Sequence, residues 1–455
     1  MRVLFLLLAV GMVTSCGGTP PSHRIEAVEL HRFESLPRIQ IDGEPVSAYV
    51  TTAALGQAPF ANPKLVPVYE GGFSGVAPVR GRPSEFWVIS DRGPNQSIDL
   101  RVADDGSVFG SGAKYFPAPK YQQSISRVRV AKDGKLHFSE GVRLRRANRA
   151  VVGLPSNATG RPSRETAFVG IRSKENPLAS SPNGYDFEGV QEEISSAGSR
   201  RFWTCDEYGP SIQVFDEIGN LLEEYVPGVA VQEPGVPRVF PLPSVLRHRR
   251  FNRGFEGLSL TSQFAVAILQ SPFDPAGGAS GEPGSGAVHS RLHRIVRLDR
   301  TTRLVEMFAY DHFDDPDSVG RVHPDMKVGD ILALDDEASR FLVFEHAGSA
   351  FARLYRVEIR ESTTRLDEAR GVDYEAGRRS YRAVEKTLVC DLTERLARLG
   401  VPQKVEGMTL LDDRRIFLVF DNDYGFESDE AEIFALPESA RLAGAVTVTL
   451  DRSVR

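Results

Sequence analysis

The stretch Val405-Glu406-Gly407-Met408-Thr409-Leu410 decides the fold, because the chain carries four further copies of its pattern. Each copy has an apolar residue, then a small polar or acidic group beside a glycine, then a run of residues that favour β-strands. The other copies are Phe73-Ser74-Gly75-Val76, Phe187-Glu188-Gly189-Val190, Phe255-Glu256-Gly257-Leu258 and Val328-Gly329-Asp330-Ile331-Leu332. A short pattern that recurs at long intervals is the signature of a repeat architecture.

A second apolar run follows each copy after 14 to 18 residues and ends in a polar cluster. These ends are Ser90-Asp91-Arg92, Cys205-Asp206-Glu207, Leu269-Gln270, Phe344-Glu345-His346 and Phe420-Asp421-Asn422. That spacing fits a hairpin of two strands of about five to six residues each. The copies themselves are 68 to 114 residues apart, which suits a four-stranded blade with insertions. We therefore predict an all-β fold, a β-propeller. The longest interval leaves room for one extra blade near residues 125–130, which makes about six blades.

The acidic residues of the repeat are expected to meet at one end of a central channel, because the first strand of each blade lines that channel. The first set is Glu188, Glu256, Asp330 and Glu406, and the second is Asp91, Asp206, Glu345 and Asp421. Oxygen-rich sites of this kind suit hard divalent cations. We predict a divalent metal site here, with Ca²⁺ as the ion. The alternative is that the acids accept hydrogen bonds from neighbouring blades and only hold the blades together.

Basic residues accompany these acids within three positions along the chain: Arg92, Arg253, Lys327 and Lys404. Such residues can hold the anionic oxygens of a substrate next to a metal, although ordinary ion pairing with the same acids is an equal alternative. The catalytic role is assigned to Glu256, Glu406, Arg253 and Arg92. His346 is the histidine that falls within the repeat frame, and it is a candidate general base.

Composition and charge bound the class of protein. The 455 residues are 41% hydrophobic and 25% charged, which is ordinary for a soluble globular chain. The net charge of −6 is spread without long blocks of one sign, which disfavours nucleic acid as a partner. The repeat runs without a break in composition, so we expect a single propeller domain over residues 27–455.

The N-terminus has the pattern of an export signal. Residues 1–15 have a short basic start and an apolar stretch too short to span a bilayer. The segment Val13-Thr14-Ser15-Cys16 resembles a bacterial lipobox, which predicts lipidation at Cys16; a plain secretory signal is the alternative. Residues 16–26 then form a flexible tether. We expect a cell-envelope protein whose membrane contact is this anchor, on the outer membrane and facing the periplasm or the cell surface. Whether Cys205 and Cys390 form a disulfide stays open.

Several motifs, in order along the chain, resemble the bacterial phytase-like family, also described as esterase-like activity of phytase. They are Gly71-Gly72-Phe73-Ser74-Gly75-Val76, Ser90-Asp91-Arg92-Gly93, Phe187-Glu188-Gly189, Asp206-Glu207-Tyr208-Gly209-Pro210, Asn252-Arg253-Gly254-Phe255-Glu256-Gly257-Leu258 and Phe420-Asp421-Asn422-Asp423. The resemblance runs from about Pro67 to about Leu436 and implies a propeller-type, exported, all-β domain. One departure is Phe344-Glu345-His346, where the family usually has Leu-Glu-Arg.

Together these observations predict an exported, lipid-anchored, metal-dependent hydrolase of a small anionic phosphoester or ester substrate. Two alternatives belong to different classes. One is a lactonase-like esterase with the same metal. The other is a non-catalytic propeller that binds a ligand or partner at the cell surface.

Overall fold

We describe the protein from a computed structural model of the 455-residue chain. The structure describes residues 25–50, 64–97, 101–102, 108–109, 112–170, 177–228, 238–273, 290–312, 326–347, 350–401, 405–412, 414–421, 424 and 444–451. Strands dominate these residues, which confirms the all-β class. The helical segments are short: α1 (Thr393–Leu399), η2 (Ser244–His248) and η4 (Glu368–Arg370). Within the described ranges, no helix is both long and apolar enough to cross a membrane.

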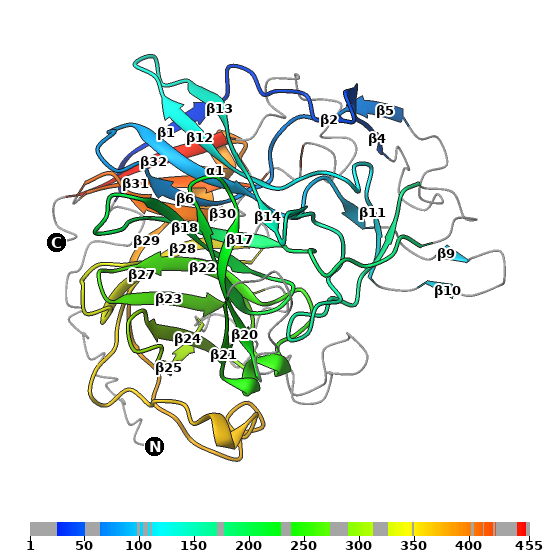
Figure 1. The fold of residues 1–455 in the computed structure, drawn as a ribbon. Helices are drawn as coiled ribbons and strands as arrows, with labels where there is room; N and C mark the ends of the chain where they lie inside the picture. Colours follow the sequence, from blue (N-terminus) through cyan, green and yellow to red (C-terminus); the bar gives the residue numbers. More distant parts are fainter. Residues whose placement is uncertain are drawn as a thin grey trace, which may run out of the picture.

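The described residues contain five antiparallel sheets of four or five strands, arranged as a fan (Figure 1). The first has β6 (Phe73–Pro78), β7 (Glu85–Ser90), β12 (Ser124–Val130) and β13 (Leu136–Arg143). The second has β17 (Phe187–Ile194), β18 (Arg200–Asp206), β19 (Ser211–Asp216), β20 (Leu221–Pro227) and a parallel edge strand, β21 (Val239–Leu242). The third has β22 (Phe255–Leu260), β23 (Phe264–Leu269), β24 (Leu292–Asp299) and β25 (Val305–Asp311).

The fourth sheet has β26 (Lys327–Ala333), β27 (Arg340–Ala347), β28 (Phe351–Glu358) and β29 (Glu385–Asp391). The fifth combines both ends of the chain: β30 (Val405–Leu410), β31 (Arg415–Phe420), β32 (Gly444–Leu450) and β1 (Ile25–Arg32). In this last sheet Ile25 pairs with Leu450 and Arg32 with Gly444. The strand β1 begins at Ile25, and the predicted domain boundary at residue 27 falls within it.

The first strand of each sheet contacts the first strands of two other sheets. β6 contacts β17 and β30, β17 contacts β22, and β26 contacts both β22 and β30. A large apolar cluster lies between each such pair of sheets, as where Phe86 of β7 stacks on Phe417 of β31 with 4.3 Å between ring centroids. Full burial of one such side chain stabilises the fold by about 1.5–3 kcal/mol. Sheets that radiate from a common set of inner strands are typical of a β-propeller.

The extra blade expected near residues 125–130 is wrong. These residues belong to β12, which pairs with β7 and is the third strand of the sheet that begins with β6. The long interval instead contains short strands that form small sheets of their own: β8 (Gln96–Ser97), β9 (Arg101–Val102), β10 (Val108–Phe109), β11 (Ala113–Tyr115), β14 (Arg145–Arg146), β15 (Arg149–Ala150) and β16 (Thr166–Phe168).

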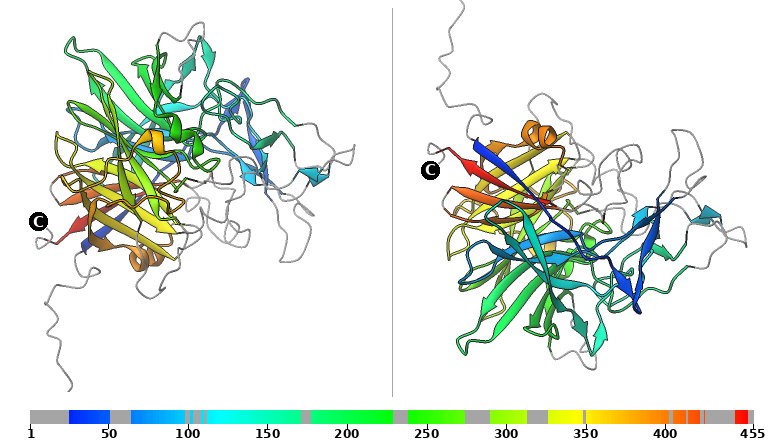
Figure 2. Two further views of the ribbon diagram at one scale, coloured as in Figure 1. Left: turned by 90° about the horizontal axis from the view of Figure 1, so that it is seen from below. Right: turned by 90° about the horizontal axis from the view of Figure 1, so that it is seen from above.

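Four further short strands precede the first large sheet: β2 (Gln40–Ile41), β3 (Glu44–Pro45), β4 (Ser47–Val50) and β5 (Lys64–Pro67). The strands β4, β5, β9, β10 and β11 project to one side of the fan, and the two further views agree (Figure 2). The insertion therefore builds a lateral extension of the domain. One of its strands, β11, brings Lys114 to the site described next.

Candidate metal centre

Each of the five inner strands begins with a β-bulge. In β17, Phe187 pairs with Asp206 and Gly189 pairs with Cys205, so Glu188 is the extra, unpaired residue. The same interruption occurs in the other four inner strands, and the extra residues are Ser74, Glu188, Glu256, Gly329 and Glu406. Because a bulge redirects a side chain out of the normal alternation, the repeated glutamates turn toward the common centre of the inner strands.

Three of these bulge residues form a compact carboxylate group. Glu188, Glu256 and Glu406 each offer an oxygen within 4.8 Å of the other two, and all three residues are buried. Ser74 donates a hydrogen bond from Oγ to Oε2 of Glu406 at 3.2 Å. We call Glu188, Glu256 and Glu406 the bulge triad. It confirms the prediction that acids far apart in sequence meet at one point.

The charge of the bulge triad is compensated only in part, since Lys327 lowers the pKa of Glu256 but burial and neighbouring acids outweigh it. Gln270 is close enough to lower the pKa of Glu256, yet neither Glu256 oxygen accepts a hydrogen bond of ordinary geometry from the described residues, and Oε2 of Glu188 accepts none either. Burial, followed by the charges of Glu256 and Glu406, raises the pKa of Glu188 well above its usual range. Burial, followed by Glu207 and Glu406, does the same to Glu256. Buried carboxylates without partners are costly unless a cation compensates them.

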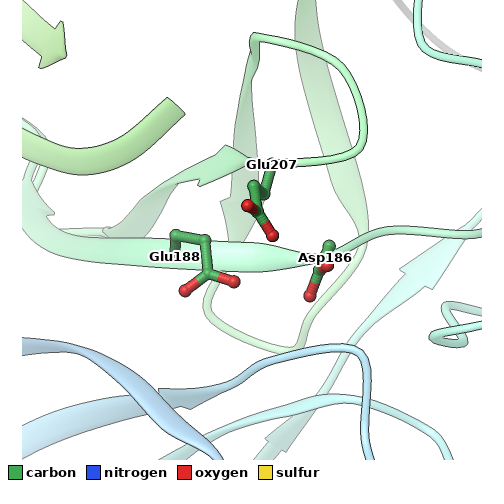
Figure 3. Close-up of side chains that lie close together, drawn as sticks. All are labelled: Asp186, Glu188 and Glu207. Atoms are coloured by element: carbon green, nitrogen blue, oxygen red, sulfur yellow. The ribbon is translucent and has the colours of Figure 1, made fainter. Parts of the chain in front are cut away.

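A second carboxylate group shares Glu188. Asp186, Glu188 and Glu207 each offer an oxygen within 4.8 Å of the others, and Figure 3 shows their carboxylates pointing toward one space. We call these three residues the flanking triad. Burial raises the pKa of Asp186 most strongly, Arg92 lowers it and Glu207 raises it further, with a net rise. Sequence analysis missed Asp186 and Glu207. The available signal was their closeness along the chain to predicted site residues, since Asp186 lies two residues before Glu188 and Glu207 directly follows Asp206.

Every residue of the two triads except Asp186 lines one cavity of about 370 Å³. Its acidic lining residues are Asp91, Glu165, Glu188, Glu207, Glu256, Glu406 and Asp421, and its basic lining residues are Arg92, Lys114, Arg253 and Lys327. Phe251 is the one aromatic residue among the described residues that line the cavity. The cavity therefore brings together five of the eight acids and three of the four bases that sequence predicted. Lys404 and Cys16 lie outside the described residues.

The predicted substrate contact Arg92 lines the cavity but is already engaged. Its Nη1 lies 3.0 Å from Oε2 of Glu165 and 3.2 Å from Oδ2 of Asp186. Arg253 is less committed, since its Nη1 lies 3.8 Å from Oε1 of Glu207 and donates to the amide oxygen of Gln270. The ion pairs make Arg92 a residue that orients the flanking acids, whereas Arg253 is better placed to face a bound anion.

Asp330 does not line the cavity, because the predicted repeat frame was one residue out in β26. The bulge residue there is Gly329, and Asp330 takes the position held by Gly75, Gly189, Gly257 and Gly407 in the other strands. At that level the inner strands meet closely: a Cβ added to Gly257 would lie 2.4 Å from Oδ1 of Asp330. Asp330 accepts hydrogen bonds from the N–H groups of Ile331 and Met408, each at 2.7 Å, and so joins β26 to β30.

Two other predicted metal ligands also serve the scaffold. Asp206 accepts hydrogen bonds from the N–H groups of Asp186 at 2.9 Å and Tyr208 at 3.1 Å, and it pairs with Arg161 at 3.3 Å. Burial, offset by Arg161, raises the pKa of Asp206 to about 6.

Glu345 accepts a hydrogen bond from Tyr310 at 2.6 Å and pairs with Lys386. Glu345 and the candidate general base His346 are both outside the cavity lining among the described residues. Cys205 and Cys390 are both buried and are not joined by a disulfide.

Solved structures give only distant likenesses. The PQQ-bound aldose sugar dehydrogenase from Streptomyces coelicolor is 10% identical, with 92% of this chain and 100% of that one covered and a TM-score of 0.28. A GH43 β-1,3-galactosidase is 8% identical, with 70% of this chain and 97% of that one covered and a TM-score of 0.27. An apocarotenoid oxygenase from Synechocystis is 12% identical, with 77% of each chain covered and a TM-score of 0.28. Likeness at this level decides neither fold nor function.

The family comparison is more informative. No curated protein matches the chain. One family matches residues 69–424, which include all five inner strands and every residue of both triads, and it carries the description "Phytase-like: Esterase-like activity of phytase". The chain therefore belongs to the phytase-like family.

Proposed function

We propose that this protein is an exported, lipid-anchored hydrolase of small phosphoesters that depends on a divalent cation, Ca²⁺, in the cavity of a five-bladed propeller. The observation that carries the proposal is the bulge triad. Its three buried carboxylates converge within 4.8 Å, and Glu256 has no hydrogen-bond partner among the described residues. The order of contacts between inner strands, which returns from β30 to β6, supports five closed blades.

The residues of the bulge triad fit a hard cation. They offer only carboxylate oxygens, the donors that Ca²⁺ prefers, with no thiolate or imidazole among them. A cation bound there would polarise the scissile ester and make an attacking water more acidic. Glu188, Glu256 and Glu406 would hold it, and the hydrogen bond from Ser74 orients the carboxylate of Glu406.

The cavity lining favours a phosphoester over an aryl ester or a lactone. Arg253, Lys114 and Lys327 supply positive charge at the wall, and Arg253 keeps 29% of its side chain exposed. Charged donors of this kind bind phosphate oxygens through short, strong hydrogen bonds. An apolar acyl or aryl group would find only Phe251 to pack against in the described lining. Specificity therefore rests on charge.

The test is a substrate panel with metal control. Phosphomonoester, lactone and aryl-ester substrates are assayed with Ca²⁺, with Mg²⁺ and after chelation, for wild type, Glu256→Gln and Glu217→Gln. Glu217 is an exposed carboxylate in the turn between β19 and β20 and is not among the residues that line the cavity, so it is the matched control. We expect Ca²⁺-dependent phosphoester turnover in wild type and Glu217→Gln. Loss of a ligand in Glu256→Gln should weaken metal affinity by at least about tenfold.

Three results would overturn this function. Turnover that is unchanged by chelation would remove the metal from the mechanism. A clear preference for lactones or aryl esters would move the protein to the lactonase-like class. A thermal response to Ca²⁺ without turnover of any ester would favour a non-catalytic, ligand-binding propeller, because cation binding does not itself require catalysis.

A further inference from the structure

Glu188 stands between two carboxylate groups. It is the bulge residue of β17, and it belongs to both the bulge triad and the flanking triad. Figure 3 shows that Asp186 and Glu207 approach Glu188 from the start of β17 and from the turn after β18. A carboxylate has two oxygens, so one residue in this position can serve two centres at once.

The flanking triad contains two buried oxygens that accept no aligned hydrogen bond from the described residues, one on Asp186 and one on the shared Glu188. Oδ1 of Asp186 accepts the N–H of Arg92 at 3.2 Å. Oδ2 of Asp186 lies 3.2 Å from Nη1 of Arg92, but it accepts no aligned hydrogen bond from the described residues. Oε2 of Glu188 likewise accepts no hydrogen bond from the described residues. Asp186 is 1% exposed and Glu188 is 5% exposed. Nη1 of Arg92 is shared with Glu165, so Arg92 compensates Asp186 only in part.

The charge balance of the cavity calls for more than one cation. With Asp186 included, eight acidic residues face four basic ones, a formal excess of four negative charges. One divalent cation would leave two of these charges uncompensated beside an anionic substrate. Two divalent cations would bring the cavity to formal neutrality. Like charges held this close together disfavour ionisation of one another in the absence of cations.

We propose that the cavity binds two divalent cations, one in the bulge triad and a second in the flanking triad, with Glu188 as the ligand they share. The proposal rests on the proposed function and deepens it. A pair of adjacent cations suits a substrate group with several anionic oxygens, as in a phosphoester, better than a carboxyl ester with one polarised carbonyl. Arg92 then positions Asp186 and Glu165 around the second cation, without contacting substrate.

The experiment is calcium titration calorimetry on the full mature chain after chelator treatment and dialysis. Wild type and the control Glu217→Gln should bind about two Ca²⁺ per chain. Glu207→Gln and Asp186→Asn should each lose one site and keep one. Glu256→Gln should also keep one, and Glu188→Gln should bind least because it removes a ligand from both triads. Circular dichroism and the melting temperature of each variant establish that it is folded.

The number of Ca²⁺ ions bound per wild-type chain tests the proposal even if a variant fails to fold. One Ca²⁺ per chain in wild type would overturn the second site and leave the proposed function standing. No Ca²⁺ binding at all would overturn both. Two sites that persist unchanged in both Glu207→Gln and Asp186→Asn would show that the second cation lies elsewhere and would refute the flanking triad.

Discussion

At the scale of single residues, Glu256 has the most unusual environment. It is fully buried, and neither of its carboxylate oxygens has a hydrogen-bond partner within the described part of the chain. Removing a carboxylate from water without a partner costs several kcal/mol. A protein retains such a residue where a cation or a proton compensates it. The two possibilities differ in how stability responds to calcium and to pH.

Calcium should stabilise wild type and stabilise Glu256→Gln less. A ligand that binds only the folded state adds about 2.7 kcal/mol to the free energy of unfolding at a hundredfold excess over Kd. The amide of glutamine preserves the shape of the side chain but removes the charge. Melting temperatures with and without calcium measure the effect, and Glu217→Gln is the control. Equal calcium shifts in wild type and Glu256→Gln would mean that Glu256 is not a ligand.

Stability of the cation-free protein should fall as pH rises above about 4. Burial and neighbouring acids raise the pKa values of Glu188, Glu256 and Asp186. Between the unfolded pKa, near 4, and the raised folded pKa, the folded state holds protons that the unfolded state has lost. Folding therefore becomes less favourable as pH increases. Chemical denaturation between pH 5 and 8 in chelator should show this fall, and calcium should reduce it. A flat profile in chelator would contradict the raised pKa values.

Asp330 should contribute to the stability of the fold and should not contribute to calcium binding. Its carboxylate accepts the N–H of Met408 and so joins two inner strands. Asp330→Ala leaves that buried N–H without an acceptor, which costs about 1–3 kcal/mol. The calcium stoichiometry of Asp330→Ala should equal that of wild type. If calorimetry shows a lost site, then Asp330 takes part in cation binding.

The site could be predicted from sequence only as far as the repeat frame was correct. Glu188, Glu256 and Glu406 each follow an apolar residue and precede a glycine, and all three meet. Asp330 fits the residue pattern of the repeat. The strand pairing shows, however, that it lies one position after the bulge residue of β26, and the sequence alone does not reveal this. Asp186 and Glu207 were missed because neither recurs in the other copies of the pattern. Their role depends on the path of two turns next to Glu188.

At the scale of elements, four of the five inner strands have a glycine directly after the bulge. A Cβ added to Gly75 would lie 2.8 Å from Cα of Gly189 on the adjacent strand, so the two backbones are in direct contact. A backbone neighbour cannot move aside as a side chain can. This close approach brings the bulge residues of different sheets within reach of one another and sets the dimensions of the bulge triad.

Gly75→Ala should therefore destabilise the protein, although alanine is the smallest possible addition. Forcing a methyl group into a packed contact typically costs about 1–3 kcal/mol. Chemical denaturation measures the change. The exposed residue Ser196 offers a control, since Ser196→Ala should alter stability by less than about 0.5 kcal/mol. A Gly75→Ala variant as stable as the control would show that the inner strands can separate at little cost.

The individual strands could be predicted from the sequence better than the assignment of strands to sheets. Each copy of the pattern begins an inner strand, and each second apolar run forms its partner. The number of sheets could not be read from spacing alone, because a 114-residue interval fits an extra blade as well as an insertion. The insertion forms short strands that pair among themselves beside the fan, and that outcome depends on long-range packing.

At the scale of the whole molecule, the fifth sheet joins the two ends of the chain. β1 pairs with β32 along its length, so the first described strand is the outer edge of the last sheet. Arg414 in the turn between β30 and β31 reinforces this edge, with Nη2 donating to the carbonyl oxygen of Leu450 at 3.0 Å and pairing with Glu26. The domain therefore needs both ends of the chain in place before the last sheet is complete.

Replacement of Cys16 should release the protein from membranes. If Cys16 carries the lipid, Cys16→Ala removes the acceptor atom and should give a soluble or unprocessed product with an unchanged domain. Fractionation of cells and incorporation of radiolabelled lipid measure this outcome. A Ser22→Ala variant is a control for changes in the tether. Labelled lipid that persists in Cys16→Ala would contradict the lipoprotein prediction.

The direction of β1 determines which end of the domain would face a bilayer. Ile25 lies beside Leu450 and the turn after Leu410, at the opposite end of the sheet from Glu406. The nine positions from 16 to 24 reach about 30 Å at most. An anchor at Cys16 would thus attach the molecule by the pole opposite the cavity. Substrate would arrive from the aqueous compartment, so dissolved molecules and not lipid headgroups of the same membrane are the accessible pool.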